Sequence, residues 1–107
     1  MNFRKLAESQ GLEEDEFLEL VELFVETCAS DLDRLQSAIA RGDTQLAVQA
    51  AHSIKGASGN LGLHEIYEMA KSVEEKAREK SLEGATEAVK AMREKNDQLS
   101  ESLRKLG

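Results

Sequence analysis

His52 and the residues that follow it could together carry a phosphoryl group. Lys55 comes three residues later, and Gly56 and Gly59 come about one and two helical turns later. A neutral imidazole is a nucleophile near pH 7, and a lysine ammonium beside it can hold an anionic group. Because a glycine inside a helix costs about 1 kcal/mol relative to alanine, two glycines here need another reason. Absent side chains let a second molecule approach closely, which indicates a phosphoryl acceptor served by a docking partner.

The segment from Thr44 to Asn60 is expected to form the helix that presents these residues. On a wheel at about 100° per residue, small and apolar residues surround Ile54 on one face, namely Leu46, Ala47, Ala50, Ala51, Ile54, Ala57, Ser58 and Leu61. The opposite face holds Gln45, Val48, Gln49, His52, Gly56 and Gly59. We therefore expect His52 to point to solvent with Lys55 at the rim. Val48, Gln49 and Gly59 are candidates for the surface that a partner contacts.

Four further amphipathic segments complete the expected architecture. A short segment ends at Gly11, and a long helix, whose apolar row includes Leu20, runs from the acidic residues 13–16 to a stop at residues 41–43. Gly62 precedes a fourth helix, and residues 81–84 separate it from a fifth, whose apolar row reaches Leu106 and is interrupted by Asn96. Long helices with short connections favour an antiparallel up-down-up-down four-helix bundle. The prediction is one all-α domain over residues 1–107, with the short N-terminal helix capping one end.

Composition excludes several function classes. The chain has 107 residues and a net charge of −7, which argues against nucleic acid as a partner. No apolar run approaches the roughly 20 residues that span a bilayer, and the N-terminus does not resemble a signal peptide. The one cysteine, Cys28, cannot form an internal disulfide, so a cytoplasmic location is expected. No motif for a cofactor or a metal stands out.

For the other polar residues and Cys28, the interpretation is structural rather than functional. His64 with Glu65 and Glu68 could form a metal site, but such groups on a surface helix are usually only solvated. The charged runs that begin at Glu74 and at Arg93 are interpreted as solvated helix faces. Cys28 is interpreted as a small buried hydrophobic residue.

The segment from His52 to Gly62 resembles the signature of histidine phosphotransfer (HPt) domains. That signature is His, any residue, Leu or Ile, Lys, Gly, two small residues, two variable positions, an aliphatic residue and Gly, and each fixed position is filled here. The resemblance covers nearly the whole chain. It implies a monomeric phosphocarrier rather than an enzyme, in which His52 accepts the phosphoryl group, Lys55 supplies charge and Gly56 gives clearance. The implied partners are a receiver domain of a hybrid histidine kinase, a response regulator, or both, which supply the catalytic carboxylates and Mg²⁺.

Two other functions stay open at this point. The phosphoacceptor domain of a chemotaxis-type histidine kinase has a similar His-x-Ile-Lys-Gly motif. A catalytically silent helical adaptor would keep the fold and bind a receiver without transfer. The intact His52, Lys55 and Gly56 favour the carrier over the adaptor. The chain could be a free-standing carrier or a piece of a larger protein.

Overall fold

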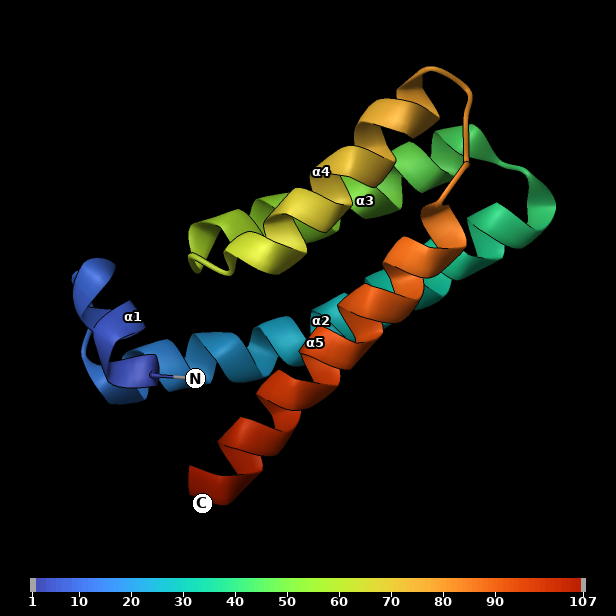
Figure 1. The fold of residues 1–107 in the computed structure, drawn as a ribbon. Coiled ribbons are helices and arrows are strands. Elements are labelled where there is room, and N and C mark those ends of the chain that lie inside the picture. The colour runs from blue at the N-terminus through green and yellow to red at the C-terminus, as the bar shows by residue number, and fades with distance from the viewer. Residues whose placement is uncertain (1, 107) are drawn as a thin grey trace.

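The computed structural model describes residues 2–106, and these form five α-helices with no strand among them. The helices are α1 (Phe3–Ser9), α2 (Glu14–Arg41), α3 (Thr44–Asn60), α4 (His64–Arg78) and α5 (Ala85–Leu106). Figure 1 shows α2 to α5 running alternately in opposite directions, with α1 across the end where α2 begins. The predicted all-α fold, a four-helix bundle preceded by a short helix, is confirmed.

Local signals set the helix ends where the sequence predicts them. The backbone N–H of Glu13 donates to Glu16 Oε1 at 3.1 Å, and the acidic first turn of α2 suits the positive end of its dipole. Gly42 ends α2 in the left-handed conformation with φ of 67°, a backbone shape that glycine adopts without a steric cost. The Asp43 carboxylate then accepts from the backbone N–H of Leu46 at 3.0 Å and caps α3.

The buried core draws apolar residues from every helix, including Phe3, Phe17, Leu32, Ile54, Val73 and Met92. α3 packs against α2 and α4, and α5 completes the bundle against the same two helices. The predicted inner face of α3 is confirmed, since Ala47, Ala50, Ala51, Ile54 and Ser58 are buried. With one face of α3 packed in this way, its opposite face is presented outward.

Three positions depart from the apolar periodicity. Leu20 and Leu106, which the spacing assigns to apolar rows, are exposed by 42% and 57%. Along α2, Leu20 lies beyond the point where the antiparallel α3 ends, so α3 does not cover it. Leu106 lies in the last turn of α5, where it too lacks a full set of neighbours. Asn96 is buried, and its side-chain amide donates to the Val25 carbonyl of α2 at 3.0 Å. Within residues 2–106, no helix has both the length and the hydropathy to cross a bilayer.

Candidate functional site

His52 lies in the middle of α3 and is open to solvent. Its side chain is 62% exposed, as predicted, because Ile54 and the alanines of the opposite face turn the helix toward the core. Ser53 and Lys55 flank it on either side of the helix, toward α2 and α4 respectively. These two neighbours connect the outward face of α3 to the rest of the bundle.

A buried carboxylate, Glu74 of α4, joins His52 to two cations. Glu74 Oε2 lies 2.9 Å from His52 Nδ1 and 2.7 Å from Arg78 Nη2, and Oε1 lies 2.8 Å from Lys55 Nζ. The Glu74 side chain is only 4% exposed. The interpretation of Glu74 as part of a solvated face is therefore wrong. The sequence did contain an indication of this burial. Glu74 follows Ala70 by four residues, which places it on the buried side of α4.

The partners of Glu74 decide its ionisation state. Burial by itself raises the pKa of this carboxyl group, but the hydrogen bonds from Lys55, Arg78 and His52 outweigh burial, and the pKa falls from 4.5 to about 2. Glu74 is therefore a carboxylate at neutral pH. A carboxylate only accepts hydrogen bonds, so Nδ1 of His52 must donate. In the neutral ring, Nε2 then carries the lone pair and is the nucleophilic atom.

Lys55 places a positive charge on the same carboxylate that the imidazole contacts. One contact of its ammonium is taken by Glu74, and the side chain keeps 27% of its surface exposed. An ammonium has three N–H donors, so donors remain for an anionic group that arrives at His52. Lys55 and Arg78 supply two positive charges against the one negative charge of Glu74, which favours an incoming dianion.

On its other side, α3 is tied to α2. Ser53 Oγ donates to Asp31 Oδ2 at 2.7 Å, and Arg34 donates to the other oxygen of Asp31 at 3.2 Å. Asp31 lies within the stretch of α2, Cys28 to Leu35, that antiparallel counting about the turn at residues 41–43 places opposite His52, and its contact with Ser53 agrees with that register. Cys28 itself is buried, as predicted, and burial with the nearby Asp31 raises the pKa of its thiol to about 12.

The two glycines near His52 have different surroundings. A Cβ atom built on Gly56 would meet nothing within 4 Å, so intramolecular packing does not require glycine there. A Cβ atom on Gly59 would lie 3.2 Å from Cδ2 of Tyr67 in α4. Gly59 thus has an intramolecular reason, the close approach of the Tyr67 ring, in addition to the partner contact expected from the sequence. Clearance for a partner at Gly56, expected from the sequence, stays a prediction.

Val48 and Gln49, the other expected contact residues, lie one turn before His52. Val48 is half-buried and Gln49 is exposed. Both line an open groove between α3 and α4, together with Thr44, Gln45, Ala77, Arg78 and Lys80. Because Arg78 also contacts Glu74, the groove adjoins the cluster around His52.

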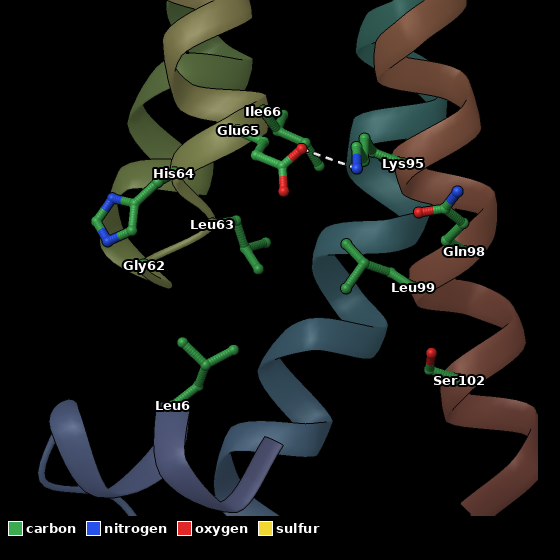
Figure 2. Close-up of a pocket in the computed structure, with 10 residues that line it drawn as sticks. All are labelled: Leu6, Gly62, Leu63, His64, Glu65, Ile66, Lys95, Gln98, Leu99 and Ser102. Carbon is green, nitrogen blue, oxygen red and sulfur yellow. Dashed lines mark ion pairs between the residues drawn. The ribbon is translucent and has the colours of Figure 1, made fainter. Parts of the chain in front are cut away.

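A separate hollow of about 360 Å³ lies away from His52, between α1, the start of α4 and α5 (Figure 2). Glu65 is paired there with Lys95 at 2.8 Å, and Figure 2 shows the His64 ring directed away from that pair. Glu65 therefore turns to a lysine rather than to His64. Among residues 2–106, no group of three or more His, Cys, Asp or Glu side chains could hold a metal ion.

Comparisons with known proteins agree with this geometry. The family model described as Hpt domain matches residues 19–102, which contain the whole of α3 and α4. The crystal structure of histidine-containing phosphotransfer protein B from Pseudomonas aeruginosa PAO1 is similar, with 31% sequence identity and a TM-score of 0.82 over 95% of this chain and 89% of that chain. No curated protein matches the chain.

Proposed function

The chain belongs to the Hpt domain family and functions in histidine phosphotransfer within a phosphorelay, and we propose that His52 is the residue that carries the phosphoryl group. The observation that carries this assignment is the contact of 2.9 Å between His52 Nδ1 and the buried Glu74 carboxylate. It leaves Nε2, the ring nitrogen that does not contact Glu74, for an incoming phosphoryl group.

In the proposed step, the Nε2 lone pair attacks the phosphorus atom of an aspartyl phosphate on a receiver domain. The bond between phosphorus and the aspartate oxygen breaks, and its electron pair returns to the aspartate carboxylate. Nδ1 keeps its proton, so the phosphorylated ring becomes cationic. Glu74, ionised and in contact with Nδ1, stabilises that charge as it develops. Transfer to a second receiver reverses these bond changes.

Lys55 has a distinct role in the proposal. Its ammonium, held by Glu74 at 2.8 Å, is placed to attract the phosphoryl oxygens and to lower the repulsion between two anions. The receiver supplies the remaining catalytic groups, its own carboxylates and Mg²⁺. Phosphoryl transfer depends mostly on positioning and charge stabilisation, so this chain acts as a positioned carrier rather than as an autonomous enzyme.

The receiver is proposed to dock over α2 and α3. Gly56 leaves open space beside His52, and Leu23 of α2 is a large apolar side chain exposed by 57%. Leu23 lies on the same flank of α2 as Asp31, within about 80° on the helical wheel, and Ser53 contacts Asp31. The offset of eight positions places Leu23 about 12 Å from Asp31 along the helix. A domain-sized partner centred on His52 spans that distance.

Further parts of the proposal concern the whole chain. Residues from all five helices share the buried core, which supports one domain over residues 1–107. We propose a monomer in the cytoplasm, where the free Cys28 would stay reduced.

Phosphotransfer from receiver domains of the same genome tests the assignment. Each receiver is phosphorylated with labelled phosphate, mixed with this protein, and transfer of the label is followed over time. We expect at least one receiver to label the unmodified protein and none to label His52→Gln, whose fold is checked by circular dichroism. Label on the His52→Gln protein, or on another residue by mass spectrometry, would contradict the assignment.

A further inference from the structure

The groove between α3 and α4 extends the His52 face along the first half of α3, and its charged residues are all cations. Its lining consists of Thr44, Gln45, Val48, Gln49, Ala77, Arg78 and Lys80. Two of these residues are cationic and none is acidic. The chain as a whole has a net charge of −7. A second hollow, lined by Gln36, Ile39, Thr86, Val89, Lys90 and Arg93, also has only cations among its charged residues, but only the groove between α3 and α4 includes Arg78, which contacts the Glu74 carboxylate beside His52. A surface of this kind attracts an acidic group.

Lys80 stands at a backbone position that usually holds glycine. It follows the end of α4 with φ of 67°, and the backbone N–H groups of Lys80 and Ser81 donate to Ala77 and Lys76, both at 2.9 Å. These two bonds form the Schellman motif, in which the left-handed residue is most often glycine. A side chain in this conformation costs about 1–2 kcal/mol. This chain nevertheless keeps a lysine there, and the turn fixes its side chain at the groove.

Arg78 connects the groove to the reacting histidine. Its guanidinium gives one nitrogen to Glu74 Oε2 at 2.7 Å, and the same oxygen lies 2.9 Å from His52 Nδ1. The Arg78 side chain is 60% exposed, so its other N–H groups face outward. An anion bound in the groove would therefore sit against a residue that already holds the phosphoacceptor cluster together.

From these observations we propose that the groove is a second docking element, which receives an acidic surface loop of the receiver domain and selects among receivers. A carboxylate of that loop would pair with Lys80 and Arg78, and a neighbouring apolar side chain would rest on Val48 and Ala77. The inference builds on the proposed phosphocarrier function. Contacts at the rim of an interface mainly set association rate, salt dependence and partner choice, which is what a carrier serving particular receivers requires.

Two substitutions at Lys80 separate docking from folding. Lys80→Gly removes the charge and relieves the left-handed strain, so we expect its melting temperature to stay equal or to rise. Lys80→Glu reverses the charge. For a receiver that this protein serves, we expect the apparent second-order rate of transfer to fall about threefold with Lys80→Gly and about tenfold with Lys80→Glu at low salt, and the losses to shrink in high salt. Lys90→Glu, an exposed lysine of α5 outside the groove, is the matched control.

The outcomes are distinguishable from a failure of the phosphocarrier function. If no receiver labels the unmodified protein, the proposed function fails. If receivers label it, and both Lys80 variants transfer at the unmodified rate at each salt concentration, the groove proposal alone fails. An equal loss with Lys90→Glu would also overturn it, because net charge rather than the groove would then control association. Restoration of the Lys80→Glu rate by replacing one acidic loop residue of the receiver with lysine would support it.

Discussion

Replacing Glu74 by glutamine tests the reasoning about the site most directly. The substitution keeps the shape of the side chain and removes its charge. Three cationic or ionisable partners, His52, Lys55 and Arg78, then lose the carboxylate that lies between them. An amide can also turn its NH₂ group toward His52, which would favour the ring form with its proton on Nε2. We expect both stability and transfer rate to fall, each by a magnitude that the geometry bounds.

The loss of stability follows from the pKa of Glu74. Despite burial, which raises it, this pKa lies at about 2 instead of 4.5, and each unit corresponds to about 1.36 kcal/mol. The ionised form therefore favours folding by at most about 3 kcal/mol at neutral pH. His52 and Arg78 are 62% and 60% exposed, and water weakens their attraction to the carboxylate. We expect Glu74→Gln to lower the free energy of unfolding by about 1–2 kcal/mol.

The loss of rate follows from the charge that forms on the ring. Two unit charges about 4 Å apart attract by about 1 kcal/mol in water and by about 4 kcal/mol at an effective dielectric constant of 20. The exposed His52 lies nearer the aqueous limit, so Glu74 is worth about 1–2 kcal/mol to the cationic phosphorylated ring. That free energy corresponds to about a 5- to 30-fold slower transfer to Glu74→Gln.

Three measurements on one pair of variants check the argument. Thermal unfolding gives the stability, a transfer time course gives the rate, and nitrogen NMR of the imidazole gives the position of its proton. Glu75→Gln, a change of the exposed neighbouring glutamate, is the control and should behave as the unmodified protein. Should Glu74→Gln transfer at the unmodified rate with the proton still on Nδ1, the carboxylate would have no part in positioning or stabilising the ring.

The remaining predictions concern the histidine, the glycines and pH. His52→Gln should lose all labelling, because the proposed acceptor is gone, and should unfold at a nearly unchanged temperature, because the side chain is exposed and a glutamine amide can also donate to Glu74. Gly56→Ala should raise the free energy of unfolding by up to about 1 kcal/mol, and Gly56→Gln should stay folded but transfer the phosphoryl group slowly. Gly59→Ala should gain no stability, since its Cβ would press on Tyr67. Thermal unfolding and transfer rates check all three variants. The depressed pKa of Glu74 means that its ionised form stabilises the fold fully above about pH 4.5, and this stabilisation is lost as the pH falls toward 2. Acid titration should therefore erase the stability difference between the unmodified protein and Glu74→Gln.

Helix number and helix ends could be predicted because their causes are local. Gly42 and Asp43 act on the turns they belong to, and the apolar row of α3 requires only its own periodicity. Exposure at Leu20 could not be predicted in the same way. It depends on where α3 stops beside α2, which is a property of two helices and the turn after them. The apolar pattern assigns Leu20 to the core, although the neighbour that would cover it is absent at that level.

The same difference between local and long-range causes applies to the residues of the site. His52, Lys55 and Gly56 lie within five residues, so their spacing on one helix already brings them together. Glu74 is 22 residues beyond His52, and contact between them depends on how α3 crosses α4. An acidic residue on the buried side of a helix indicates that a partner exists. It does not indicate which side chains of the chain supply that partner, and three do: the cations Lys55 and Arg78, and His52.

Glu74 matters both for the stability of the bundle and for the proposed chemistry. A carboxylate that is 4% exposed would destabilise the bundle unless hydrogen-bond donors surround it. Lys55 and His52 from α3, with Arg78 from α4, supply those donors. The same contacts place the His52 proton on Nδ1 and hold the Lys55 ammonium on the carboxylate that His52 contacts, and in the proposed mechanism Glu74 provides the negative charge that stabilises the phosphorylated ring. If His52 is the phosphoryl acceptor, packing of α3 against α4 prepares the nucleophile before a receiver arrives, the open space at Gly56 gives the receiver access, and the receiver brings the remaining catalytic groups.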